Sequence, residues 1–124
     1  MMKKFEKAFK MPFKNTKSIG NWICDANDEL CFQLIQEEYW EKNRQKIFLE
    51  ILNGEKEINI NGTPKYNSFD GVVYFKDKPH ILIRGWGYLT GSGGLNLSEL
   101  EANEIQDDLA EYIVDRLTPK NRTT

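Results

Sequence analysis

Few side chains in this 124-residue sequence have the types and spacing that a chemical reaction requires. The one histidine, His80, has no Cys or Ser beside it in the sequence, so a nucleophile could reach it only through the fold. Cys24 and Cys31 match no zinc motif, because a structural zinc site takes four Cys or His ligands and there is no further cysteine. We therefore predict no catalytic residue and no metal site. A small hydrolase or nuclease centred on His80 is the least supported class.

A glycine-rich stretch comes nearest to a cofactor motif. Gly85, Gly87 and Gly91 follow an apolar run and are weakly similar to a dinucleotide-binding loop, but the next helix starts only near Glu99 and no parallel βαβ unit surrounds the stretch. No Lys-Ser or Lys-Thr pair follows Gly93-Gly94, which excludes a phosphate-binding P-loop. We interpret the stretch as a connector and predict no cofactor.

The carboxylates are concentrated on one predicted helix. Ser98 and Glu101 form an S-x-x-E capping box, in which the hydroxyl and the carboxylate each accept a backbone N–H, so a helix begins near Glu99 and runs to Leu117. At 100° per residue its apolar residues share one face: Ala102, Ile105, Leu109, Tyr112 and Ile113. The opposite side carries an acidic ridge, which consists of Glu101, Glu104, Asp108, Glu111 and Asp115.

This acidic ridge is unfavourable for the helix itself. Like charges four residues apart, such as Glu104 and Asp108, destabilise a helix by about 0.2–0.5 kcal/mol per pair. A solvated helix face also lacks the desolvation that acid–base catalysis uses. We therefore expect the ridge to bind a partner, with simple solvation as the alternative.

The net charge of −2 hides an uneven distribution. Residues 1–20 hold six lysines and one glutamate, whereas residues 98–118 hold seven carboxylates and one arginine. The small net charge argues against bulk, non-specific binding of nucleic acid. The basic and acidic segments could bind different partners or each other.

Residues 1–18 form a basic N-terminal arm or a short helix, because Phe5, Phe9 and Phe13 recur every four residues among lysines. Two interpretations stay open: an arm that engages nucleic acid or a membrane surface, or a segment docked onto the domain by its Phe side chains. In the first, the arm and the aromatic residues near Arg84 would suit splayed bases. The candidate nucleic-acid-binding residues are then Lys3, Lys4, Lys7, Lys10, Lys14, Arg84, Trp86 and Tyr88.

Two hairpins and a further helix are predicted in residues 19–118. A two-residue turn at Asn27-Asp28 would pair Ile23 with Phe32 and Cys24 with Cys31. Residues 36–53 read as a helix that ends at Gly54, with Arg44 lying within its buried stripe by angle. One side of the first hairpin is predicted to carry Ile23, Leu30, Phe32 and Leu34. The buried stripe of the helix is predicted to consist of Trp40, Ile47, Phe48 and Ile51.

The second hairpin pairs Val72–Phe75 with His80–Arg84 across the turn Lys76-Asp77-Lys78, and an edge strand or loop precedes it. The order β-β-α-(β)-β-β-α predicts an α+β fold, with an antiparallel sheet of four or five strands and two helices packed on one face. Residues 19–118 would form one domain, followed by a polar tail, residues 119–124. The sequence contains no apolar run of about 18 residues and no secretory signal, so we expect a cytoplasmic protein with no membrane contact.

The run from Ile81 to Leu117 resembles the C-terminal part of small uncharacterised proteins carried by bacteriophages and other bacterial mobile elements. Its markers are Arg84-Gly85-Trp86-Gly87, Thr90-Gly91 and Ile105-Gln106-Asp107-Asp108. The resemblance implies a setting, because accessory proteins of this size commonly bind and modulate a host protein, including anti-CRISPR proteins and other antagonists of nucleic-acid-targeting defence. It implies no catalytic residue.

We therefore expect a non-enzymatic binding or inhibitor protein whose acidic ridge contacts a basic surface on a partner that handles nucleic acid. The alternative is an RNA- or single-strand-binding module that uses the basic arm and the loop aromatics.

Overall fold

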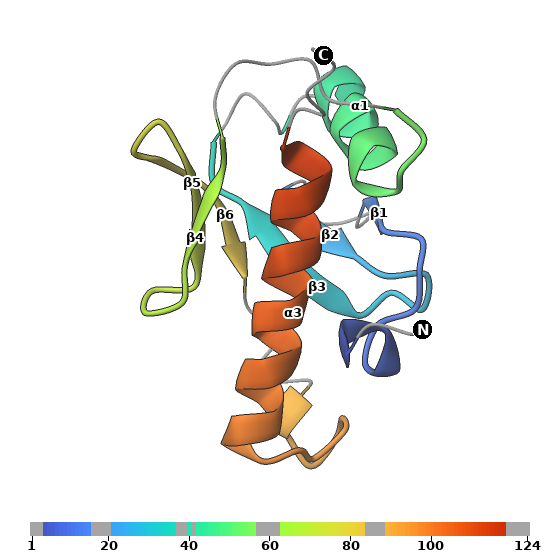
Figure 1. Cartoon of the computed structure of the whole chain (residues 1–124). Helices are drawn as coiled ribbons and strands as arrows, with labels where there is room; N and C mark the ends of the chain where they lie inside the picture. The colour runs from blue at the N-terminus through green and yellow to red at the C-terminus, as the bar shows by residue number, and fades with distance from the viewer. Residues whose placement is uncertain are drawn as a thin grey trace.

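Within the part of the chain that the structure describes, a six-stranded antiparallel sheet forms the centre, in the order β1-β2-β3-β6-β5-β4 (Figure 1). The computed structural model describes residues 4–15, 21–36, 40, 42–56, 63–83 and 89–118. The strands are β1 (Lys14–Asn15), β2 (Trp22–Cys24), β3 (Leu30–Leu34), β4 (Lys65–Asn67), β5 (Val72–Phe75) and β6 (Lys78–Ile83). The predicted α+β class is confirmed. The strand count was too low because β1 has two polar residues and therefore no alternating pattern.

Helix α3 (Glu99–Leu117) runs down one face of the sheet, and α1 (Lys42–Leu52) packs beside its C-terminal end (Figure 1). The 3₁₀ helix η1 (Lys4–Lys7) lies on the other side of α3 from β4 and β5. One hydrophobic cluster joins these elements to the sheet. Its fully buried large side chains include Phe5, Phe9, Ile23, Phe32, Leu34, Leu52, Val73, Ile81, Leu109 and Ile113.

The start and phase of α3 agree with the sequence. The Glu101 N–H donates to Ser98 Oγ at 3.2 Å, which caps the helix as predicted. The return contact differs from a standard capping box, because the Glu101 carboxylate accepts from the Ser98 hydroxyl instead of from its backbone N–H. The predicted apolar face is buried, with Tyr112 half-buried at its margin.

The first hairpin has a different register near its turn. Ile23 pairs with Phe32 as predicted, but Cys24 pairs with Leu30, which leaves Cys31 unpaired in a β-bulge. The predicted pairing of Cys24 with Cys31 is therefore wrong. The bulge turns Cys31 into the core and leaves Leu30 exposed, so Leu30 does not share the buried side.

Helix α1 is rotated relative to the predicted stripe. Trp40 and Ile47 are 43% and 47% exposed, and Arg44 also lies on the exposed side. The buried positions are Gln45, Phe48, Leu49 and Leu52, which follow the i, i+3, i+4, i+7 pattern. That pattern was missed because a glutamine occupies its first position. Of the earlier part of the predicted helix, residues 37–39 and 41 lie outside the described residues.

Gly54 ends α1 as predicted. It adopts a left-handed φ of 81°, and the Gly54 and Glu55 N–H groups donate to the Ile51 and Glu50 carbonyls at 3.1 and 2.7 Å. These two bonds form a Schellman motif. A Cβ at position 54 would also lie 3.1 Å from the flexible Arg116 guanidinium, which can move by a few tenths of an ångström, so the left-handed backbone is what favours glycine here.

The second hairpin is confirmed, with a shorter turn. Only Lys76 and Asp77 form the turn, both with positive φ, as a two-residue type I′ connection requires, and β6 already begins at Lys78. His80 is the extra residue of a bulge in β6, between the pairs Tyr74–Pro79 and Val73–Ile81. The preceding edge strand is β4, which pairs with β5.

Replacing Leu109 by Ala should lower the free energy of unfolding by about 2–5 kcal/mol, because its side chain is 1% exposed and packs between α3 and the sheet. Leu100→Ala is the matched control on the same helix, since Leu100 is 68% exposed, and it should cost less than about 0.5 kcal/mol. Urea denaturation measures both. Equal losses would contradict the observed phase of α3.

Candidate partner-binding surface

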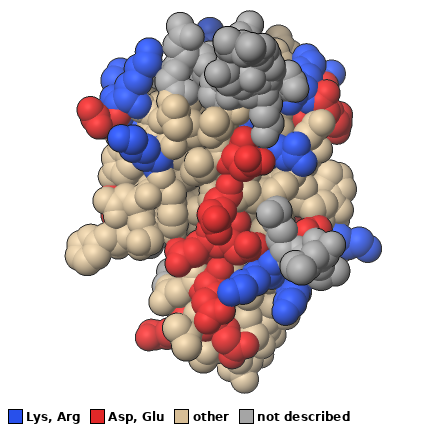
Figure 2. Space-filling view, viewed as in Figure 1, with Lys and Arg blue, Asp and Glu red and all other residues tan. Residues whose placement is uncertain are grey.

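The acidic ridge forms a continuous stripe along the exposed side of α3 (Figure 2). Glu101, Glu104, Glu111 and Asp115 are exposed, and Asp108 is half-buried. All five residues belong to α3. They share one face of this helix because they are spaced three and four residues apart. The sequence therefore predicts correctly which carboxylates lie together.

The N-terminal segment already uses part of this ridge. The Phe5 N–H donates to Asp108 Oδ2 at 3.0 Å, and Lys4 Nζ lies 3.1 Å from Glu104 Oε2. Asp108 thus satisfies a backbone donor at the start of η1, as a helix-capping carboxylate does. Of the two arrangements that the charge distribution left open, contact between the basic and acidic segments is present in the structure.

Docking by the Phe side chains is the interpretation of this segment that the structure supports. Phe5, Phe9 and Phe13 are each 1–2% exposed. The Phe5 ring packs on Tyr112 of α3 at 5.0 Å between centroids, and Phe13 packs edge-on against Phe32 of β3 at 5.3 Å. Residues 4–13 therefore contribute to the same core as the sheet.

Polar side chains also hold this segment in place. The Lys10 N–H donates to Asp25 Oδ2 at 2.7 Å, and the Phe13 N–H donates to Asn53 Oδ1 at 2.9 Å. Asn53 Nδ2 returns a hydrogen bond to the Phe13 carbonyl at 3.0 Å. The segment is thus attached by its backbone to the β2–β3 turn and to the end of α1.

The alternative nucleic-acid-binding residues are only partly described. Lys3, Arg84, Trp86 and Tyr88 lie outside the described residues. Lys4, Lys7, Lys10 and Lys14 are exposed, but Lys4 pairs with Glu104, and Lys14 Nζ lies 2.9 Å from Asp28 Oδ1. The hydrogen bond to Asp28 raises the pKa of Lys14. Of these four candidate lysines, Lys4 and Lys14 therefore face carboxylates of the same chain.

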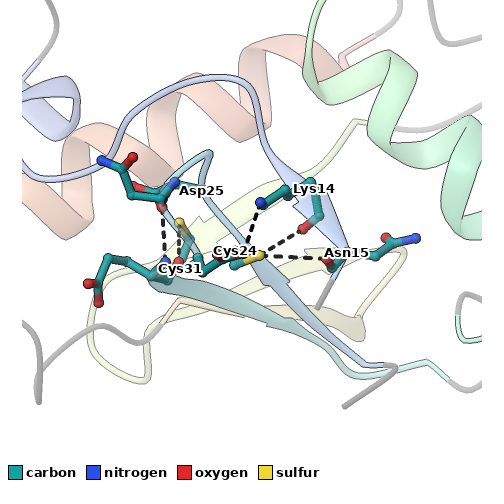
Figure 3. A network of polar contacts seen from close by, with 8 residues as sticks. Lys14, Asn15, Cys24, Asp25 and Cys31 are labelled. Atoms are coloured by element: carbon teal, nitrogen blue, oxygen red, sulfur yellow. Dashed lines mark hydrogen bonds and ion pairs between the residues drawn. The ribbon is translucent and has the colours of Figure 1, made fainter. Parts of the chain in front are cut away.

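The two cysteines are buried and free (Figure 3). The Cys24 thiol donates to the Lys14 carbonyl at 3.4 Å, and the Cys31 thiol donates to the Glu29 carbonyl at 3.4 Å. Burial raises the pKa of both thiols, so little thiolate forms near neutral pH. Beside them, the buried Asp25 accepts from the Asn27 and Glu29 N–H groups at 2.8 and 2.9 Å, which shapes the β2–β3 turn.

His80 has a packing environment. It is half-buried in β6, and its ring lies edge-on to Phe75 at 5.1 Å between centroids. Within the described residues, no group of three or more His, Cys, Asp or Glu side chains is arranged to hold a metal ion. None of the helices in that part of the chain is long and apolar enough to cross a membrane.

A scan against protein-family models and searches of curated proteins and of solved structures found no match for this chain.

Sequence reasoning missed a second feature beside the ridge. The turn between β4 and β5 presents Phe69 at 98% exposure, and Tyr66 of β4 donates from its hydroxyl to Asp107 of α3 at 3.2 Å. The turn-forming run Asn67-Ser68-Phe69-Asp70-Gly71 was the available signal, because a large apolar residue at the tip of a polar turn is exposed by geometry.

Asp108→Ala should destabilise the protein by about 1–2 kcal/mol, because the Phe5 N–H would lose a charged acceptor. Glu111→Ala removes a charge from the same helix face without removing that bond and should have little effect. Chemical denaturation compares the two variants, and amide exchange at Phe5 should accelerate only in Asp108→Ala. Equal stability of the two variants would contradict this role of Asp108.

Cys24 and Cys31 should resist Ellman's reagent at pH 8 in the native protein, because both side chains are 1% exposed and their pKa values are raised by burial. Both thiols should react promptly in denaturant, which serves as the control. Rapid native-state labelling of either thiol would show that the β2–β3 hairpin opens readily.

Proposed function

We propose that this chain is a non-enzymatic binding protein that applies the acidic ridge to a basic surface on a protein that handles nucleic acid. The observation that carries the proposal is the stripe of exposed carboxylates along α3. From Glu104 to Asp115 it extends about 16 Å at 1.5 Å per residue. Carboxylates over that length can occupy positions where backbone phosphates would otherwise contact the partner.

The ion pair between the N-terminal segment and the ridge is weak. The ion pair between Lys4 and Glu104 is exposed on both sides, and such pairs contribute only about 0–1 kcal/mol. A basic group of the partner can therefore replace Lys4 at little cost. Asp108 is different, because its bond to the Phe5 N–H supports the fold. We assign partner contact to Glu101, Glu104 and Glu111.

Competition with nucleic acid is the action that this surface suits. An acidic helix face that covers a basic cleft would block it without any chemical step. The resemblance to accessory proteins of phages and mobile elements adds a setting, in which the partner belongs to nucleic-acid-targeting defence. Anti-CRISPR activity is one form that such inhibition would take.

The test compares partner capture by two double variants. Glu104→Gln with Glu111→Gln removes two ridge charges and leaves Asp108 intact, whereas Glu50→Gln with Glu55→Gln removes two charges near the end of α1. Purified nucleic-acid-handling defence complexes, immobilised at low salt, provide the partners. We expect the ridge variant to bind at least about tenfold more weakly and the control to bind normally.

Added salt should weaken wild-type binding, because surface charges are screened over about 8–10 Å at 0.1–0.15 M ionic strength. Full retention of binding by the ridge variant would contradict the proposal. Direct binding of RNA or single-stranded DNA with a steep salt dependence would replace it with the nucleic-acid-binding alternative.

A further inference from the structure

A polar groove of about 480 Å³ lies beside the acidic ridge, between the β4–β5 turn and α3. The turn lies to one side of α3 in Figure 1, opposite η1. Tyr66, Phe69 and Asp70 line the groove from the sheet side, and Gln106 and Asp107 line it from the helix. Its lining includes two carboxylates and no Lys or Arg among the described residues. The volume lies within the range of roughly 300–1,000 Å³ that is typical of binding pockets.

The turn that forms one wall is fixed by its own side chains. Asn67 Oδ1 accepts the Phe69 N–H at 2.9 Å, and Asp70 Oδ1 accepts the Val72 N–H at 3.0 Å. Gly71 has a left-handed φ of 72°, and a Cβ there would lie 3.3 Å from the Ile83 carbonyl oxygen. The turn therefore fixes the backbone at Phe69, and the exposed Phe69 ring stands at the rim of the groove.

The helix wall contains a polar group that lacks a hydrogen bond. Gln106 is 7% exposed, and its Nε2 is fully buried without an acceptor among the described residues. Buried amide donors are nearly always paired, so this unpaired one marks a point in the groove wall where the Gln106 side chain can turn outward to an acceptor on a ligand.

Beside the Gln106 amide donor, Asp107 provides a carboxylate acceptor. Its Oδ1 accepts the Tyr66 hydroxyl at 3.2 Å, and its side chain is exposed toward the groove. Burial and the neighbouring Asp107 raise the pKa of Tyr66 to about 12, so the phenol remains a donor at neutral pH and keeps the carboxylate oriented. The remaining lone pairs of the carboxylate suit a cationic donor.

We propose that this groove binds an arginine residue of the partner, with the guanidinium on Asp107, its plane against Phe69, and the peptide carbonyl of the arginine accepting from Gln106 Nε2. This assignment rests on the proposed function, because it supplies the basic partner. A guanidinium is favoured over an ammonium, since its planar fork bonds a carboxylate in two places and stacks on an aromatic ring. The two carboxylates among the described lining residues favour a cationic occupant over an anionic one.

The first test uses N-acetyl-arginine amide, which carries both the guanidinium and the carbonyl. We expect dose-dependent NMR shifts of the Gln106 side-chain amide and of the Phe69 and Asp70 backbone amides, with an affinity in the millimolar range. Asp107→Asn should weaken this binding about tenfold, whereas Glu55→Gln, an exposed position just after α1, should leave it unchanged. N-acetyl-citrulline amide has the same shape without the charge and should bind at least about tenfold more weakly.

Two results would overturn the assignment: no shift of the Gln106 amide at saturating arginine amide, or equal binding of the citrulline compound. Phe69→Ala is a second variant that leaves the core intact, because its ring is exposed, and it should also weaken binding.

Partner capture separates this inference from the proposed function. If Phe69→Ala with Asp107→Asn binds the partner normally while the ridge variant does not, the groove assignment is wrong and the proposed function stands. If arginine amide binds in the groove but no protein partner is bound, the groove assignment stands and the proposed function fails.

Discussion

Attachment of the N-terminal segment is the constraint on which the rest of the structure depends. Three backbone N–H groups of this segment donate to Asp108, Asp25 and Asn53, which come from α3, the β2–β3 turn and the end of α1. Between these polar contacts, the Phe side chains fill the space under α3. The segment therefore determines how the last helix, the first hairpin and α1 lie relative to one another, and it sets one border of the acidic ridge.

Elements with strong local signals were predictable. Helix α3 has a cap and a long apolar repeat, and the β5–β6 hairpin has β-branched runs on both sides of a short turn. The phase of α1 was not predictable in this way, because Ile47 and Leu49 allow two different apolar stripes. Tertiary contact decides between them: the Tyr112 hydroxyl donates to the Leu52 carbonyl at 2.8 Å, which helps seat α1 against α3. The bulge at Cys31 likewise depends on the Asp25-centred turn.

The candidate surface also has one part that local sequence patterns predict and another part that depends on tertiary contacts. Helical periodicity identifies the ridge carboxylates, since it requires only one element. The engagement of Glu104 and Asp108 by η1 joins residues about 100 positions apart, and no local pattern carries that information. The groove is similar, because Phe69 and Gln106 come from separate elements and look unremarkable in sequence. The ridge and the groove together give α3 two adjacent polar surfaces. The hydrogen bond from the Phe5 N–H to Asp108, which supports the fold, lies on the side of α3 away from the groove.

The position of α3 in the chain has a consequence for synthesis on the ribosome. Phe5 bonds to a residue 103 positions later, and its ring packs on Tyr112 of the same helix. Until the ribosome has released α3, the nascent chain therefore carries Phe5 without the helix that covers it. Contacts of such long sequence separation form late and slowly, because a long loop must close first. The face of the sheet stays exposed until α3 packs on it, and the exposed aromatic segment is a natural site for chaperone recognition during that interval.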